Sequence, residues 1–257
     1  MKYIYETHLH TIEASACSRT PAKDYIDHMM GLGYSGIIVT DHFFTGNSCV
    51  PKDLPWKERI AIYCSGYEHA LEAAKGHDFT VMFGIEFNFQ GDEFMIYGVD
   101  KKWLEDHPEI MEISRRELYD LVHASGGIML QAHPYRERGY LSAIHLSPTI
   151  GDGAEVFNAG NDDYMNALAY DYAVKNNFRM ASGSDIHFPM DDMGGMSFPY
   201  KINSIEEYCK AFLAGDGTPV FWKDVTHTDT GFLPVETEKS LTEISQGPTL
   251  DVIIHNE

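Results

Sequence analysis

Five short segments within the first 190 residues carry histidine or carboxylate side chains, the types that bind divalent metal ions in proteins. The segments are His8-Leu9-His10, Thr40-Asp41-His42, Gly84-Ile85-Glu86, Gln131-Ala132-His133-Pro134 and Ser184-Asp185-Ile186-His187. Each segment alone is weak evidence, because a helix cap, a turn or a buried polar pair can explain it. Together they predict one metal centre, and mixed imidazole and carboxylate ligands suit Zn, Mn or Fe.

Two such ions about 3.5–4 Å apart hold a reactive hydroxide at neutral pH and clamp both the attacking and the leaving oxygen of a phosphoryl group. The chemistry that this predicts is hydrolysis of a phosphoester. The remaining charge on the phosphate needs a donor other than the metals, and Arg19 and Arg136 are the candidates because a guanidinium binds phosphate through paired hydrogen bonds. The alternative for each arginine is a surface salt bridge.

Short apolar runs alternate with stretches of helical periodicity, and five of the runs end at the segments above. Strands are expected at Tyr3–Tyr5, Ile37–Val39, Phe79–Ile85, Phe94–Val99, Ile128–Leu130, Glu155–Phe157 and Arg179–Ala181. Helices are expected at Pro21–Leu32, Trp56–Lys75, Glu109–Ala124 and Asp163–Lys175. Repeated β-then-α units favour a parallel sheet closed into a barrel. The carboxyl ends of parallel strands meet at one rim, so residues from 8 to 187 would converge there.

The chain of 257 residues has the length of one α/β barrel and shows no second core. We expect the barrel over residues 1–225 and a tail or hairpin packed on it over residues 226–257, which are rich in Thr, Glu, Ser and Asp. The loop Phe43–Pro55 directly follows a strand and is a candidate lid over a substrate.

Hydrophobic residues make up 44% of the chain, which excludes a disordered protein. A formal charge of −20 disfavours binding to nucleic acid or to an anionic membrane, and an anionic substrate would need bound cations. The four cysteines form no C-x-x-C pair, and no secretory signal or spanning segment is evident, so we expect a cytoplasmic protein. Its oligomeric state is left open.

The order and content of HLH, VTDH, GIEF, QAHP and GSDIH resemble the PHP family, named for polymerase and histidinol phosphatase domains, over residues 4 to about 190. The resemblance implies a distorted (β/α)7 barrel with its active site at the carboxyl ends of the strands. It also implies a metal-dependent phosphoesterase with two or three divalent ions. The expected substrate is a small phosphate ester such as a nucleotide, a cyclic nucleotide or histidinol phosphate.

The resemblance implies a role for each residue of the cluster. The first ion would lie on His8 and His10, and Glu86 would bridge two ions. The second ion would take His133. The full expected ligand set is His8, His10, Glu13, His42, Glu86, His133, Asp185 and His187.

The third ion would take His42 and His187, and Asp185 would bridge or close the first. Asp41 would orient His42. Proton transfer to the leaving oxygen would come from His42, His187 or a metal-bound water, so the expected catalytic residues are His42, Glu86, Asp185 and His187.

Two positions depart from the family pattern. Members usually carry an Asp or His shortly after His-x-His, where this chain offers Glu13 or, second, Cys17. Many also carry a His eight to eleven residues beyond the strand-three glutamate, where this chain offers only Asp92 or Glu93. The ion that this histidine holds in the family could instead be bound here by fewer protein ligands and more water.

Two other functions stay open. A C–N hydrolase of the amidohydrolase type also uses a metal barrel with His-x-His, although such proteins more often carry a bridging lysine where this chain has Glu86. A metal-stabilised regulatory domain without activity is the non-enzyme alternative. Among the remaining histidines, which we expect to be structural, His107 and His145 are the two to check.

Overall fold

The computed structural model describes residues 3–190, 192–223, 231–238, 241 and 244–256. Its strands are β1 (Tyr3–Leu9), β2 (Gly36–Val39), β3 (Thr80–Phe89), β4 (Asp92–Tyr97), β5 (Ile128–Gln131), β6 (Ile144–Leu146), β7 (Gly153–Asn158), β8 (Arg179–Gly183), β9 (Met193–Phe198), β10 (Thr218–Trp222), β11 (Leu233–Pro234) and β12 (Val252–Ile254). In the described chain, ten of them form one sheet in the order β11-β10-β9-β1-β2-β3-β4-β5-β7-β8, and β12 pairs with β6.

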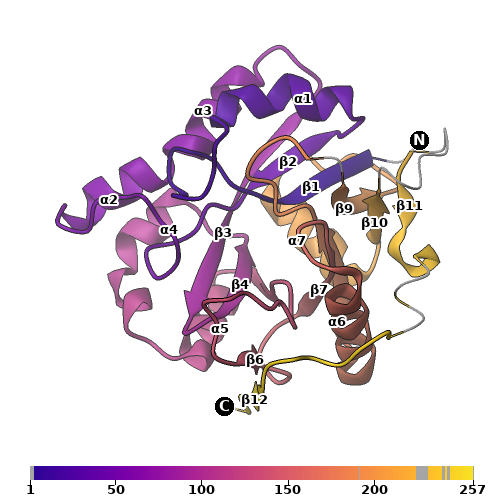
Figure 1. Cartoon of the computed structure of the whole chain (residues 1–257). Helices are drawn as coiled ribbons and strands as arrows, with labels where there is room; N and C mark the ends of the chain where they lie inside the picture. The colour runs from indigo at the N-terminus through magenta and orange to yellow at the C-terminus, as the bar shows by residue number, and fades with distance from the viewer. Residues whose placement is uncertain (1–2, 191, 224–230, 239–240, 242–243, 257) are drawn as a thin grey trace.

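The helices lie around this sheet (Figure 1). They are α1 (Tyr25–Gly31), α2 (Trp56–Tyr63), α3 (Ser65–Ala73), α4 (Lys101–Asp106), α5 (Arg115–Ala124), α6 (Asp163–Asn176) and α7 (Ile205–Ala214), with short 3-10 turns at Ala22–Asp24, Pro108–Met111 and Val235–Thr237. The strands carry buried apolar residues on both faces, as expected for a sheet covered by helices.

The sheet is strongly curled, because the segment after β8 bonds back to β1. Leu9 and Ile186 form a parallel bridge, the amide of His10 donates to the carbonyl of Ile186 at 2.9 Å, and the amide of Ile186 donates to the carbonyl of His8 at 3.2 Å. The carboxyl ends of β1 and β8 therefore lie side by side. This is the rim at which the predicted metal-binding segments were expected to meet.

All seven expected strands exist, and β4 runs antiparallel to both neighbours in the expected, mainly parallel part of the sheet. Strands β3 and β4 form an antiparallel hairpin in which Phe89 pairs with Asp92 across a two-residue turn. The turn residues Gln90 and Gly91 both have positive φ, 49° and 109°, as tight hairpin turns require. The amino end of β4 therefore lies at the carboxyl end of β3, which brings Glu93 to the rim.

The predicted helix Trp56–Lys75 is two helices, α2 and α3. The hydroxyl of Ser65 donates to the carbonyl of Ile62 at 2.6 Å, in competition with the helical backbone bonds at the junction. A Cβ on Gly66 would lie 2.3 Å from Thr11 Oγ1, so only glycine lets α3 approach the loop after β1 this closely.

The other expected helices differ mainly at their ends. Within the predicted helix Glu109–Ala124, the chain forms a 3-10 turn and then begins α5 at a capping box made by Ser114 and Glu117. The prediction at Asp163–Lys175 matches α6 to one residue.

The described parts of the carboxyl-terminal region contribute β11 to the edge of the ten-stranded sheet and β12 to a separate two-stranded sheet. Strand β11 pairs with β10, and β12 pairs in parallel with β6. The expected boundary near residue 225 lies outside the described residues. Over the described ranges, no helix combines the length and apolar character that crossing a membrane requires.

Candidate metal centre

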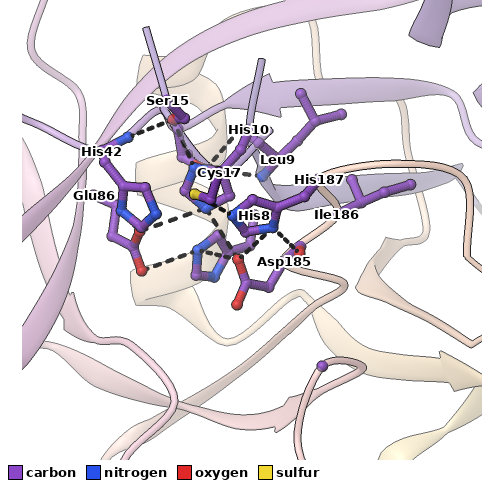
Figure 2. A network of polar contacts seen from close by, with 12 residues as sticks. His8, Leu9, His10, Ser15, Cys17, His42, Glu86, Asp185, Ile186 and His187 are labelled. Atoms are coloured by element: carbon purple, nitrogen blue, oxygen red, sulfur yellow. Dashed lines mark hydrogen bonds and ion pairs between the residues drawn. The ribbon is translucent and has the colours of Figure 1, made fainter. Parts of the chain in front are cut away.

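Side chains from the ends of β1, β2, β3, β4, β5 and β8 converge at the rim of the curled sheet (Figure 2). In the described chain, their ligand atoms form groups within 4.8 Å of one another. The groups are His8 with Glu86 and His133, His8 with His10 and Asp185, His10 with His42 and His187, and His42 with Glu86 and Glu93. The five predicted segments therefore meet in space as the parallel strands required.

Five ligand atoms in this cluster are buried and make no well-formed hydrogen bond within the described structure, although they lie within ion-pair distance of one another. They are His8 Nε2, His10 Nε2, His42 Nδ1, Glu86 Oε2 and Asp185 Oδ1. Leaving buried polar atoms without hydrogen bonds costs about 1–3 kcal/mol each, so their concentration at one point needs an explanation. Divalent cations bound to these nitrogen and oxygen atoms would satisfy them, and the donor set fits such ions.

Glu86 is the carboxylate at the centre of the cluster. Its Oε1 lies 2.9 Å from His133 Nε2 and 3.2 Å from His8 Nε2, and its Oε2 lies 2.5 Å from His42 Nδ1 and 3.4 Å from His10 Nε2. Burial alone would raise the pKa of Glu86, but His42 and His8 hold it well below its usual range. An ionised carboxylate between four imidazoles has the position that a bridging ligand needs.

Asp185 lies opposite Glu86. Its Oδ1 is 3.0 Å from His10 Nε2 and 3.4 Å from His8 Nε2. Burial opposes ionisation, but His8 and Arg136 lower the pKa of Asp185 well below its usual range. Asp185 and His133 both have positive φ, 57° and 27°, a strained backbone for non-glycine residues of the kind found at functional sites.

Glu155 on β7 contacts the Nδ1 side of the His8 ring. Its Oε1 lies 3.1 Å from His8 Nδ1, and its Oε2 accepts hydrogen bonds from the amide of His133 at 3.0 Å and from Asn158 Nδ2 at 2.8 Å. A carboxylate facing Nδ1 requires the proton on that nitrogen, which leaves Nε2 free to bind a cation. The sequence analysis missed Glu155, although a carboxylate in the sixth predicted strand was a usable signal.

Asp41 reaches His42 through Ser15, which contacts the backbone amide of His42. The Ser15 hydroxyl donates to Asp41 Oδ1 at 2.6 Å and accepts from the amide of His42 at 3.0 Å. The same oxygen lies 3.1 Å from His10 Nδ1. Because this hydroxyl donates to Asp41, it must accept from His10 Nδ1, which leaves His10 Nε2 free in the cluster.

Glu13 and Cys17, the two candidates for the ligand that follows His-x-His in the family, lie in different surroundings. Glu13 accepts a hydrogen bond from the amide of Ala22 at 3.1 Å, lies 3.1 Å from His69 Nδ1, and joins none of the ligand groups that the described residues form. The expectation that Glu13 is the stand-in does not agree with this position. Cys17 is also in none of these groups, but its sulfur lies 3.0 Å from Nε2 of His187, which is in one of them.

Burial raises the pKa of the Cys17 thiol, but hydrogen bonds with His187 and His42 lower it to about 6.

Of the two candidates to replace the missing family histidine, Asp92 is occupied elsewhere. Its carboxylate accepts from Arg115 Nε and Nη2, both at 2.8 Å. Glu93 joins His42 and Glu86, with Oε2 3.5 Å from His133 Nε2, and Asn88 Nδ2 donates to its Oε1 at 3.1 Å.

The cluster opens into a pocket of about 750 Å³. The lining includes Cys17, His42, Glu93, Asp185 and His187 from the cluster, and Thr45, Gly46, Asn47, Arg136, Arg138, Tyr140, Phe188 and Met190 around it. The loop Phe43–Pro55 thus supplies one wall. Phe43 and Phe44 are buried against Trp56 and Tyr63, which anchors this wall.

Arg136 lies in the pocket but is also tied to the cluster. Its Nη1 donates to Asp185 Oδ2 at 2.5 Å, its Nη2 to Asn158 Oδ1 at 2.6 Å and its Nε to Asn161 Oδ1 at 2.7 Å. One N–H on each terminal nitrogen is left over, since a guanidinium has five. Arg19 is exposed and stacks on the Phe188 ring at 5.6 Å, outside the residues that line the pocket.

The two other histidines that merited a check lie elsewhere. His145 Nδ1 is 2.8 Å from His255 Nε2, and His107 Nδ1 is 2.7 Å from Glu109 Oε1. Neither joins the cluster.

No family model and no curated protein matches this chain. Solved structures share its fold. A two-domain protein from Bacteroides vulgatus that contains a predicted PHP-like metal-dependent phosphoesterase superposes with a TM-score of 0.61 at 14% identity, over 87% of this chain. This chain spans 65% of that protein, less than two thirds of its length.

A second structure comes from Bifidobacterium adolescentis and is predicted to be a metal-dependent phosphoesterase. It superposes with a TM-score of 0.51 at 14% identity, over 72% of this chain and 87% of the other. An amidohydrolase from Chromobacterium violaceum superposes more weakly, with a TM-score of 0.49 at 13% identity, over 86% of this chain and 98% of the other. At these identities the first two matches show a shared fold.

Proposed function

We propose that this protein is a metal-dependent phosphoesterase that releases phosphate from a small phosphate ester. One observation carries the proposal: five buried ligand atoms without well-formed hydrogen bonds converge next to an open pocket that is lined by His42, Asp185 and Arg136. Two of the proteins that share this fold are predicted to be phosphoesterases, which supports the same reaction class. A nucleotide, a cyclic nucleotide or histidinol phosphate remains the expected kind of substrate.

The cluster residues would hold two or three divalent ions, with Zn, Mn and Fe as the candidates. Bound there, these ions would supply Lewis-acid activation of water and of the phosphoryl oxygens. Glu86 contributes a central negative charge, and Glu155 and Ser15 keep His8 and His10 in the tautomer that presents Nε2. These contacts prepare the ligands before an ion arrives.

Arg136 has two roles in this proposal. It fixes Asp185 through Nη1, and its remaining N–H groups can donate to a phosphate oxygen in the pocket. His42 and His187 belong to a ligand group with His10. The proton for the leaving oxygen would therefore come from water in the open pocket.

The pocket chemistry favours a phosphoester over a C–N substrate. No lysine is among the described residues that line the pocket, whereas a bridging lysine is more common in amidohydrolase-type sites. The described buried lysine, Lys223, instead pairs with Asp163 and lies 3.5 Å from Glu238. Arg136 and Arg138 supply two cationic groups suited to an anionic ligand.

The test is phosphate release from a panel of nucleoside monophosphates, cyclic nucleotides, sugar phosphates and histidinol phosphate, with protein loaded with Zn, Mn or Fe. We expect release from at least one class, and loss of release on chelation and in Glu86→Gln. Glu109→Gln is the matched control because Glu109 also faces a histidine but lies at the surface. Metal-loaded protein that releases phosphate from none of these substrates would contradict the proposal.

A further inference from the structure

Cys17 lies eight residues beyond the end of β1, at the mouth of the cluster. Its sulfur lines the pocket and lies 3.0 Å from His187 Nε2. The loop that carries it is fixed on both sides. The amide of Ala16 donates to the carbonyl of Asn47 at 2.9 Å, and the Ser18 hydroxyl donates to the carbonyl of His10 at 2.9 Å. The position of the sulfur therefore follows from the surrounding backbone.

The Cys17 sulfur contacts the imidazoles of His187 and His42. These two rings and that of His10 form one ligand group, which we call the three-histidine group (Figure 2). Their ligand atoms lie within 4.8 Å of one another. His10 is fully buried, and its Nε2 makes no well-formed hydrogen bond to any described residue, although Asp185 Oδ1 lies 3.0 Å away. This nitrogen is an independent sign that a cation belongs among these rings.

The orientation of His187 directs a lone pair toward the sulfur. Its Nδ1 lies 2.8 Å from the carbonyl oxygen of Asp185, which can only accept a hydrogen bond, so Nδ1 carries the proton. In the neutral ring, Nε2 is then unprotonated and faces the Cys17 sulfur. The thiol proton occupies the space between two atoms that both bind metal ions well.

We propose that the Cys17 thiolate is the fourth ligand to a cation held by the three-histidine group. The inference rests on the proposed metal-dependent function and deepens it. On binding, the cation takes the place of the thiol proton, which is released to solvent. Three imidazoles and one thiolate form a set that suits tetrahedral Zn²⁺, whereas Mg²⁺ and Mn²⁺ prefer oxygen ligands. This position of the centre therefore selects zinc.

The other cysteines provide controls. Cys64 and Cys209 are buried in the apolar core, and Cys49 is exposed with its sulfur 3.6 Å from the carbonyl oxygens of Ile12 and Glu13. Cys49→Ser changes an accessible thiol on a neighbouring loop and leaves the three-histidine group untouched. It is the matched control for Cys17→Ser.

The experiment replaces the native metal with Co²⁺ and records the absorption spectrum. A cobalt–thiolate bond gives a near-ultraviolet sulfur-to-metal charge-transfer band, which nitrogen and oxygen ligands do not give. We expect the band in the parent and in Cys49→Ser, and its loss in Cys17→Ser and Cys17→Ala. The Zn²⁺ affinity of Cys17→Ser should fall roughly tenfold or more, because even loss of a hydrogen bond behind a ligand costs 10–100-fold.

Two results would overturn the proposal. The first is a charge-transfer band that persists in both Cys17 variants, and the second is a parent that binds Co²⁺ without the band. In the second case, phosphate release by the loaded parent would leave the proposed phosphoesterase standing. A parent that binds no Co²⁺ or Zn²⁺ would contradict both proposals. Using two Cys17 variants, each checked by circular dichroism, separates loss of the ligand from loss of the fold.

Discussion

The Oε1 atom of Glu155 lies 3.1 Å from Nδ1 of His8, and both side chains are buried. Burial alone would lower the pKa of His8, but the carboxylates of Asp185, Glu155 and Glu86 raise it well above its usual value. The imidazole is thus surrounded by negative charge while its Nε2 makes no hydrogen bond to the described protein. A cation at Nε2 would compensate this charge.

Glu155→Gln should weaken metal binding because it removes the charge that holds the proton on His8 Nδ1. We expect a 10–100-fold loss of affinity for one ion, measured by competition with a chromogenic chelator. Glu109→Gln, which alters an exposed glutamate–histidine pair, should leave the affinity unchanged. Equal affinities in the parent and in Glu155→Gln would show that this contact does not support a ligand.

Glu93→Gln should remove one ion and spare the others. Glu93 joins only the group that contains His42 and Glu86, whereas His8 and His10 have other partners. Metal analysis of the variant should therefore give about one ion fewer per chain than the parent. An Asp92→Asn variant should keep the full metal content, because Asp92 pairs with Arg115. If Asp92→Asn loses the ion and Glu93→Gln keeps it, Asp92 and not Glu93 is the ligand.

The cluster residues that could be predicted from the sequence are those at the ends of parallel strands. His8, His42 and His133 converge because parallel strands present their carboxyl ends at one rim. Glu93 could be named only as one of two candidates, since the direction of β4 depends on the Gln90-Gly91 turn.

Other features depend on tertiary contacts that no local pattern reveals. Strand β9 has the sequence MGGMSF, and a Cβ on Gly194 would lie 2.4 Å from the carbonyl oxygen of Gly183. Close packing therefore requires glycines that weaken the strand pattern. The contact between Arg136 and Asp185 joins two loops 49 residues apart in sequence.

Arg136→Ala should lower catalytic efficiency by roughly ten- to a hundredfold, the loss expected for a charge-assisted hydrogen bond of about 1.5–3 kcal/mol. Because Nη1 also holds Asp185, the variant should bind metal more weakly too. Arg19→Ala is the comparison, with a smaller effect on the same substrate. Full efficiency in Arg136→Ala would exclude contact with the phosphate.

Glu6 predicts a pH dependence of stability. It is fully buried, accepts hydrogen bonds from the amides of His8 and Ser184, and burial raises the pKa of its carboxyl from 4.5 to about 7. The Glu6 carboxyl releases its proton near pH 4.5 in the unfolded chain and only near pH 7 in the folded chain. The stability that this difference contributes is therefore fully present below pH 4.5 and is lost as the pH rises through about 7.

Glu6→Gln should remove this dependence. The unfolding free energies of the parent and the variant are measured by urea titration in the presence of a chelator. As the pH rises from about 4.5 to 7, the parent should lose up to roughly 3 kcal/mol of stability relative to the variant. Other titrating groups cancel in the difference. A difference that is constant with pH, or that shifts in favour of the parent, would contradict the predicted protonation of Glu6.

The most direct test of the metal centre is the number of ions bound per chain, measured by mass spectrometry of metals in protein purified with Zn and Mn supplements. The cluster of His8, His10, Glu86 and Asp185 with its neighbours predicts at least two ions per chain in the parent and fewer in Glu86→Gln. Less than one ion per chain in the folded, supplemented parent would contradict the account.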